Sequence, residues 1–456
     1  MPPPFRQPPA IVPTLLGALA LLIAALPAAE PNQTFKSITT RSVAANRTAE
    51  RPDYAHDFSR ALSIGLESRT RYETHQDDYT QGLLSDDALV TRNLLYLSIQ
   101  KALDPLRFAV ELQDSRRFFS GLPDVPNLEN HLEPLQAYAQ LYFDHALGGA
   151  PLSLSAGRLA FDWADRRLIS RNRNRNTINA FDGFRLRLGD ENAPWEIDAI
   201  AVRPVTRSAT QLDESADDLM LYGLAGYWRG WSPHVVLEPY WLWLDQREAP
   251  TALRRNLHTF GLHTFGQWGR SSAWDYDVSL AGQWGETGSQ THRAYATHLE
   301  IGRTWASAWK PRLAAWLNYA TGDRNATDAA NQRFDPLFGA TYSFYGYSSY
   351  FSLQNMLNPT FRLSFQPHKN LKCEVMHRAI WLASDTDAWV KANRRDATGS
   401  SGRFVGQEFD ARLVWQLSSS CDLDMAYAHF FPGDFTQNTG ASPAANFLQI
   451  AATVRF

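Results

Sequence analysis

The chain ends with the stretch FLQIAATVRF, residues 447–456, and this stretch decides the fold. Its side chains alternate in character, so that the apolar ones share one face while Gln449, Thr453 and Arg455 share the other. A period of two residues is typical of a β-strand with one apolar and one polar side. The strand runs to an aromatic last residue, as in many membrane β-barrels, although soluble β-proteins can also end on a strand.

The same alternation recurs along the whole chain. In the third segment, Leu106, Phe108 and Val110 lie opposite polar side chains, and in the fourth, Leu135 and Ala137 are expected on the apolar, outward face. No helical period longer than two turns follows residue 29, so we expect an all-β fold. Eighteen strand-like segments begin near Leu62, Leu94, Leu106, Leu135, Leu152, Phe181, Trp195, Leu219, His234, Asn256, Trp274, Arg293, Pro311, Pro359, Leu371, Gln407, Asp422 and Phe447.

The connections between these segments alternate strictly between short and long. The short ones, such as Lys101–Asp104, are rich in turn-forming residues, whereas Glu73–Asp87, Gly322–Asn358 and Ala383–Gly406 are long and polar. Every second connection therefore lies on the same rim. This pattern predicts an 18-stranded antiparallel transmembrane β-barrel with short periplasmic turns, long extracellular loops and both termini in the periplasm.

Aromatic residues near strand ends favour the barrel over a soluble sandwich, propeller or β-helix. Tyrosine and tryptophan rings sit well between lipid and water and form interfacial girdles. The expected girdle residues are Tyr240, Trp241, Trp243, Trp268, Trp274, Trp381 and Trp415.

Composition excludes several other classes of protein. The 456 residues carry 44 Lys and Arg against 47 Asp and Glu, a net charge of -3, so we expect no nucleic-acid partner. A mean hydropathy of -0.36 excludes a helical polytopic membrane protein. The two cysteines, Cys373 and Cys421, fall two strands apart, too far for a disulfide bond. No catalytic constellation or metal-ligand spacing stands out, so we expect neither an enzyme nor a cofactor.

The N-terminus has the order of a secretory signal peptide. Arg6 precedes an apolar run from Ile11 to Leu26, and small residues follow. We expect residues 1–29 to be removed, with cleavage after Ala28 or Ala29; the alternative is a membrane anchor. Residues 30–57 then form an exposed periplasmic lead-in, and residues 58–456 form the barrel.

The polar strand faces would line the lumen, and most of their charges balance. The arginines expected to face the lumen are accompanied by a similar number of carboxylates, so most should pair. They include Arg69, Arg71, Arg362, Arg378, Arg412 and Arg455. One cluster between the fifth and sixth strands breaks the balance, because only Asp162 and Asp165 oppose it. Its arginines are Arg158, Arg166, Arg167, Arg171, Arg173 and Arg175, followed on the sixth strand by Arg185 and Arg187. Guanidinium groups bind carboxylates through two parallel hydrogen bonds, so the cluster could bind an anionic polymer. The alternative is a solvated external loop, or one that binds lipopolysaccharide phosphates.

Three stretches resemble the alginate export family of outer-membrane proteins. They are residues 135–188, with Phe181-Asp182-Gly183-Phe184; residues 318–338, with Thr321-Gly322-Asp323; and residues 405–456, with Phe430-Phe431-Pro432-Gly433-Asp434. The resemblance implies a monomeric 18-stranded barrel through which a polyanionic polysaccharide leaves the cell. Arg158, Arg167 and Arg185 match basic positions of the family motifs, and Asp182 could orient a neighbouring arginine.

The favoured hypothesis is a channel of the bacterial outer membrane for an anionic polysaccharide or oligosaccharide. Expected partners are that polymer, outer-membrane lipid and lipopolysaccharide, and periplasmic export proteins. The loop Gly322–Asn358, rich in aromatic residues, could fold inward as a plug; the alternative is a solvated, disordered loop. The alternatives are a structural or adhesive barrel whose loops bind surface partners, and a secreted carbohydrate-active enzyme on a soluble β-scaffold.

Overall fold

The computed structural model describes residues 51–123, 125–190, 194–228, 232, 234–250, 252–269 and 273–456. The expected signal peptide and most of the expected lead-in lie outside these residues. The end of the lead-in is not exposed as expected, because Tyr54 and Ala55 are buried and β1 (His56–Asp57) pairs with the first barrel strand. The Tyr54 hydroxyl also donates a hydrogen bond to Glu111 inside the barrel.

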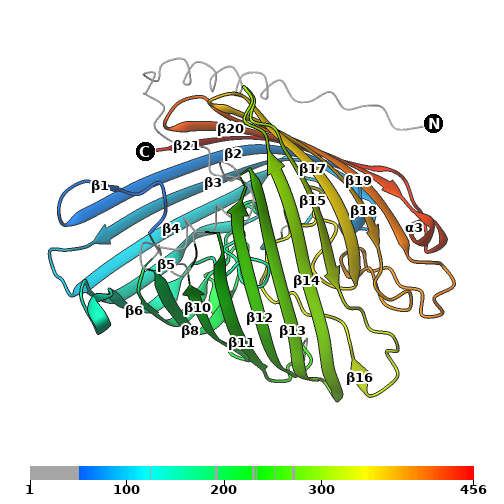
Figure 1. Ribbon diagram of the computed structural model, residues 1–456, viewed down its shortest axis with the longest axis horizontal. Helices are drawn as coiled ribbons and strands as arrows, with labels where there is room; N and C mark the ends of the chain where they lie inside the picture. Colours follow the sequence, from blue (N-terminus) through cyan, green and yellow to red (C-terminus); the bar gives the residue numbers. More distant parts are fainter. Residues whose placement is uncertain are drawn as a thin grey trace.

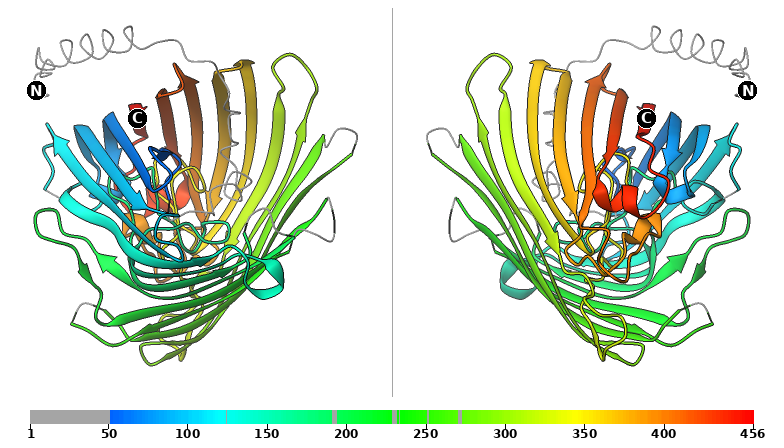
Figure 2. Two further views of the ribbon diagram at one scale, coloured as in Figure 1. Left: turned by 90° about the vertical axis from the view of Figure 1, so that its left-hand side faces the viewer. Right: turned by 90° about the vertical axis from the view of Figure 1, so that its right-hand side faces the viewer.

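Eighteen antiparallel strands of the described chain form one closed barrel (Figures 1 and 2). The last strand pairs with the first, for example through Arg69 and Thr453, and this pairing closes the sheet. The barrel strands are β2 (Leu62–Asp78), β3 (Leu84–Ile99), β4 (Leu106–Phe118), β5 (Asn130–Phe143), β6 (Leu152–Leu159), β7 (Phe181–Leu188), β8 (Trp195–Thr206), β10 (Leu219–Trp228), β11 (Val236–Gln246), β12 (Arg255–Trp268), β13 (Trp274–Thr287), β14 (Gln290–Thr304), β15 (Arg312–Ala320), β17 (Met356–His368), β18 (Leu371–Trp381), β19 (Phe404–Gln416), β20 (Cys421–Pro432) and β21 (Ala445–Arg455).

The remaining elements are short and lie at the loops. They are β9 (Glu214–Ser215), β16 (Ala330–Asn331), the 3₁₀ turns η1 (Tyr79–Gln81), η2 (Leu147–Gly149) and η4 (Val390–Ala392), and the helix α3 (Asp434–Asn438). In the part of the chain that the structure describes, no helix is long and apolar enough to cross a membrane.

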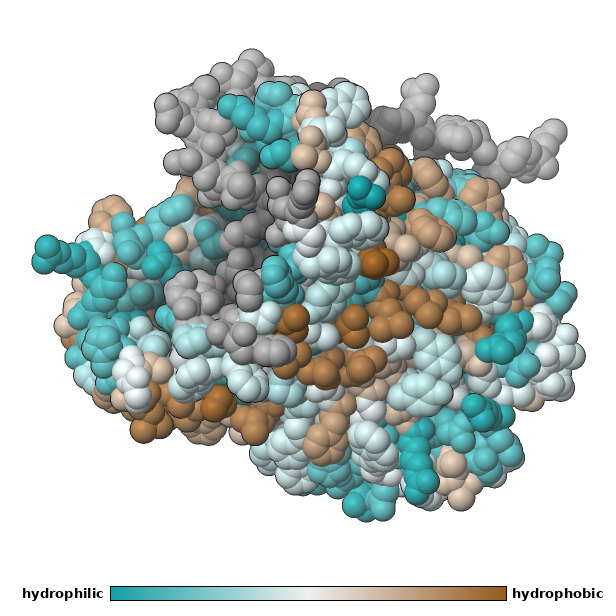
Figure 3. Space-filling view, viewed as in Figure 1, coloured by the Kyte–Doolittle hydropathy of each residue, from teal (hydrophilic) through white to brown (hydrophobic). Residues whose placement is uncertain are grey.

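The strand faces follow the predicted alternation. Ile64, Leu97 and Phe108 are about two-fifths exposed on the outside, whereas Glu67 and Glu111 are buried on the inside. Figure 3 shows hydrophobic side chains gathered over the middle of the outer wall. A wall with this pattern matches lipid outside and polar contents inside.

The fourth segment departs from the alternation. Between Glu111 and Leu112 the register of β4 against β5 shifts, and Leu135 is turned inward with an exposed fraction of 3%. A β-bulge inserts one extra residue and so reverses which side chains face out. The prediction that Leu135 faces outward with Ala137 was therefore wrong.

Two further expectations are corrected. Tyr240 does not belong to the girdle, because it is buried on the inner face of β11. The strict alternation of loop lengths also fails, since only residues 288–289 separate β13 from β14, and the expected loop Glu73–Asp87 is mostly strand. Hydrogen-bonded pairing continues beyond the membrane, where the apolar pattern that marks a strand in the sequence is lost. Cys373 and Cys421 are both free, as the strand spacing predicts.

Candidate functional site

Two loops fold into the barrel and fill part of its interior. One joins β6 to β7 (residues 160–180), and the other joins β15 to β17 (residues 321–355). The predicted inward folding of the second loop is confirmed, since Phe334 and Tyr345 are at most 1% exposed. The loops are joined by backbone hydrogen bonds, from Phe338 N to Leu168 O at 2.8 Å and from Ser170 N to Phe338 O at 3.1 Å.

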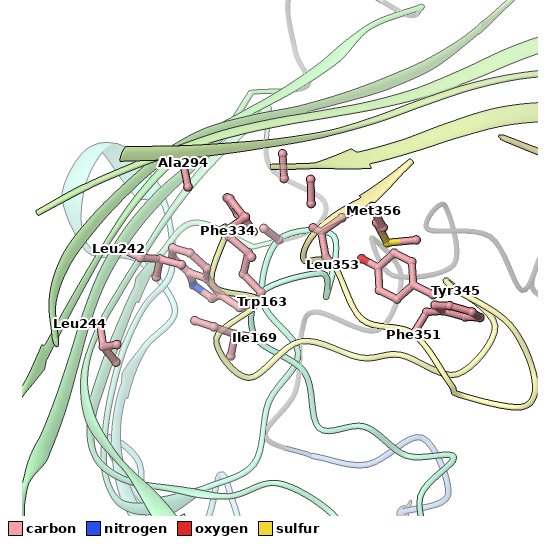
Figure 4. Close-up of a cluster of buried hydrophobic side chains, with 14 of the residues drawn as sticks. Trp163, Ile169, Leu242, Leu244, Ala294, Phe334, Tyr345, Phe351, Leu353 and Met356 are labelled. Atoms are coloured by element: carbon pink, nitrogen blue, oxygen red, sulfur yellow. The ribbon is translucent and has the colours of Figure 1, made fainter. Parts of the chain in front are cut away.

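Apolar side chains hold both loops against the wall. Figure 4 shows Trp163 and Phe334 lying together beside the wall residues Leu242 and Ala294. The Trp163 ring also meets the ring of Tyr240 edge-on, with centroids 5.9 Å apart. The inner face of the barrel thus carries an apolar region where the loops dock, in addition to its charged wall.

Wall arginines hold the other side of the first loop. Arg69 on β2 donates hydrogen bonds of 3.0–3.1 Å to the carbonyl oxygens of residues 173, 174 and 175. Arg92 on β3 donates to the carbonyl of Arg173 at 2.7 Å and forms an ion pair with Glu67 at 2.7 Å. Carbonyl oxygens are neutral overall, so these contacts orient Arg69 without cancelling its charge.

A cavity of about 290 Å³ remains between the first loop, the second loop and the wall of β2, β3, β19, β20 and β21. Seven arginines line it against three carboxylates. The arginines are Arg69, Arg71, Arg92, Arg166, Arg173, Arg412 and Arg455, and the carboxylates are Glu67, Asp162 and Asp424. We call this space the basic cavity, because most of the charged side chains on its lining are arginines. Three of these arginines also pair with carboxylates that are not on the lining, Arg71 with Glu73, Arg173 with Asp53 and Arg455 with Asp422.

Most of the predicted site residues on the wall are paired with carboxylates. Arg158 bonds to Asp182 at 2.8 Å and to Glu133 at 2.7 Å, so Asp182 does orient a neighbouring arginine. The other wall pairs are Arg185–Asp198, Arg187–Glu196, Arg362–Glu300, Arg378–Asp410 and Arg412–Asp424. Each of these arginines is therefore held by a carboxylate, as expected from the similar numbers of positive and negative side chains in the lumen. Of these wall arginines, only Arg412 lines the basic cavity.

The predicted arginines of the first loop differ in their partners. Arg167 pairs with Asp165 at 3.2 Å, Arg171 with Glu111 at 3.1 Å and Arg173 with Asp53 at 3.2 Å. Within the described ranges, Arg166 and Arg175 have no carboxylate at ion-pair distance. Arg166 and Arg173 face the basic cavity, whereas Arg175 donates to Thr177 and Asn179 inside the loop. The loop is therefore not the solvated external segment of the alternative interpretation.

Four arginines of the basic cavity were outside the predicted set of site residues. Arg69, Arg71 and Arg455 were expected to face the lumen from the alternation of their strands, but they were not assigned to the substrate path. Arg92 was missed because the second segment was expected to begin near Leu94, whereas β3 begins at Leu84. The sequence feature that could have revealed Arg92 is its spacing of two residues from both Val90 and Leu94, which lie on the same buried face of β3.

The fold and the cavity define an outer-membrane channel of the porin-barrel class. A family model described as alginate export matches residues 60–448, and the chain belongs to this family. A search of curated proteins finds no match. The fold and the family place the protein in the bacterial outer membrane.

Solved structures with a similar fold are porin barrels. OccD3 (OpdP) of Pseudomonas aeruginosa is 14% identical, with 94% of this chain and 99% of that chain covered and a TM-score of 0.59. OccAB1 of Acinetobacter baumannii is 11% identical, with 89% and 99% covered and a TM-score of 0.63. OccK3 (OpdO) of Pseudomonas aeruginosa is 12% identical, with 87% and 95% covered and a TM-score of 0.60.

Proposed function

We propose that this channel passes an anionic polysaccharide or oligosaccharide, such as a polyuronate, through the basic cavity. The observation that carries the proposal is the excess of arginines over carboxylates on the lining. A chain of sugar carboxylates is a polyanion, and guanidinium groups bind carboxylates through paired, charge-assisted hydrogen bonds.

The arrangement of partners supports passage rather than permanent binding. Arg69 contacts neutral carbonyl oxygens, and Arg173 is about one-third exposed with Asp53 as its only ion-pair partner among the described residues. Both guanidinium groups can attract an anion. Once the anion has left, each can bind its partner within the protein again. Transport needs binding that is strong enough for the solute to enter and weak enough for it to leave.

The first loop is part of this proposal. It carries Arg166 and Arg173 on its cavity side and Trp163 on its docked side. Displacement of the loop from the wall would widen the lumen while it kept the arginines on the path. The gate is therefore proposed to be this loop together with the second loop, with which it is hydrogen bonded.

Single-channel recording in a planar bilayer tests the proposal. The refolded mature protein is expected to conduct and to be blocked by added polyuronate. The double variant Arg166→Gln/Arg173→Gln should weaken that block by about a hundredfold or more, because two lost charge-assisted hydrogen bonds together contribute about 3–6 kcal/mol.

Arg303→Gln is the matched control, because Arg303 is exposed on the outer face of β14, away from the lumen. An equal loss of block in Arg303→Gln, or unchanged block in the double variant, would contradict the proposal. A folded barrel without any conductance would favour a structural or adhesive role.

A further inference from the structure

The outer wall carries an apolar groove at β12, β13 and β14. Gly282 on β13 lies between Phe260 on β12 and Tyr295 on β14 in the strand register, and its missing side chain leaves room for the Trp284 ring, which would lie 2.6 Å from a Cβ atom at this position. Beside this glycine, a groove of about 640 Å³ is lined by Phe260, Leu280, Tyr295 and Leu299. These four side chains are 43–54% exposed. We call this feature the wall groove; it lies on the face seen in Figure 3.

A second cavity lies directly above the groove, at the long-loop rim. β15 ends at Ala320, opposite Ala296, so the first residues of β14 extend beyond it. There β16 pairs with β14 at Thr291 and His292 and leaves a cavity of about 660 Å³. We call it the rim cavity. Tyr295 lines both spaces and stacks on Tyr319 with ring centroids 5.6 Å apart.

The rim cavity is basic and its guanidinium groups are available. Arg293 and Arg324 line it, both are exposed, and neither has a carboxylate at ion-pair distance in the described chain. The carboxylate on the lining is Asp328, which accepts a hydrogen bond from the backbone of Ala330 at 2.8 Å. Two unpaired arginines beside an apolar groove match a ligand that has phosphate groups at one end and hydrocarbon at the other.

We propose that the wall groove and the rim cavity together bind one phosphorylated glycolipid of the outer leaflet. An acyl chain would lie in the groove along Leu280 and Leu299, and a phosphate would lie between Arg293 and Arg324. The stacked rings of Tyr295 and Tyr319 mark the level at which the headgroup meets the hydrocarbon, where such amphipathic rings are stable. The long-loop rim is the extracellular one, so the site opens to the outer leaflet. A second copy of this chain fits less well, because it would bring the same positive charges to the contact.

Native mass spectrometry of the refolded chain in detergent tests the site, with bis-phosphorylated lipid A as the probe. One lipid A molecule per chain is expected to bind more tightly than phosphatidylglycerol or fully dephosphorylated lipid A. Arg293→Gln/Arg324→Gln should weaken binding about twenty-fivefold, since a cation near a lipid headgroup contributes about fivefold. Leu280→Ala/Leu299→Ala, which removes two apolar side chains from the lining of the wall groove, should weaken it independently.

Arg303→Gln is again the matched control, on the same outer face of β14 but at the opposite rim, and it should leave binding unchanged. Heat-modifiable migration on gels verifies that each variant is folded. Equal binding of phosphorylated and dephosphorylated lipid A, or equal binding of phosphatidylglycerol, would overturn the proposal. A dimer that Leu280→Ala/Leu299→Ala abolishes would also overturn it, by assigning the groove to a second copy. Block by polyuronate is not expected to change in these variants, so this site and the proposed function are tested separately.

Discussion

Replacing Trp163 by alanine should release the first loop from the wall. Trp163 is 2% exposed and lies among Tyr240, Leu242 and Phe334. Truncating a buried tryptophan to alanine costs about 3–5 kcal/mol, because its contacts are lost and a cavity remains. Trp163 lies outside the barrel strands, so this cost falls on loop docking and not on the strand ladder.

A change of about 3–5 kcal/mol shifts the ratio of docked to released loop by about two to three and a half powers of ten. Single-channel recording should therefore show a larger conductance, or far more frequent open periods, than in the parent protein. Trp415→Ala is the matched control, because Trp415 is 45% exposed on the outer wall and touches neither loop. If Trp163→Ala folds normally and its conductance trace matches that of the parent, the loop is not held by its apolar side, and the reasoning fails.

Three further predictions concern stability, pH and thiol chemistry. Arg378→Met should lower the free energy of unfolding by about 3–5 kcal/mol in urea titrations, because it leaves the buried carboxylates of Asp410 and Glu408 without their cation. The double variant Arg378→Met/Asp410→Leu should recover part of this loss of stability. No recovery would contradict the pairing of Arg378 with Asp410. The Arg173 guanidinium lowers the pKa of the Asp53 carboxyl, so the tie between the lead-in and the first loop should be complete above the unfolded value of about 4 and lost as the pH falls through the lowered folded value. Hydrogen exchange at residues 53–57 measures this loss, and Asp53→Asn should show no such pH dependence. Maleimide labelling in urea should add two labels per chain without prior reduction, since Cys373 and Cys421 are free, and labelling that requires a reductant would refute this.

The architecture was predictable because its signal is local. Lipid outside and polar contents inside force alternation on every strand, so the eighteen strands and the closing pair β2–β21 could be expected from their side chains alone. The prediction failed where the alternation carries no information. A bulge reversed Leu135, and Arg92 was missed because β3 begins at Leu84 and not near Leu94.

The candidate site was only partly predictable, because an arginine on a strand gives no sign of its partner. Arg185 and Arg173 belong to one basic run in the sequence. In the structure, Arg185 forms two hydrogen bonds with Asp198 on the neighbouring strand, whereas Arg173 lines the basic cavity beside Asp53. Register and loop path decide between these outcomes, and both depend on contacts between residues far apart in the chain.

The sequence by itself determined the barrel, its approximate strands and the family, since each rests on patterns within a few residues of one another. Only the tertiary structure decided what fills the lumen. Leu242 and Leu244 on β11 face inward against Trp163 and Phe334, although an aqueous lumen would call for polar residues there. The apolar side chains of two distant loops provide their partners, because burial against those loops stabilises residues that water could not. The basic cavity is the space that this docking leaves, so its position exists only once the loops have folded into the barrel.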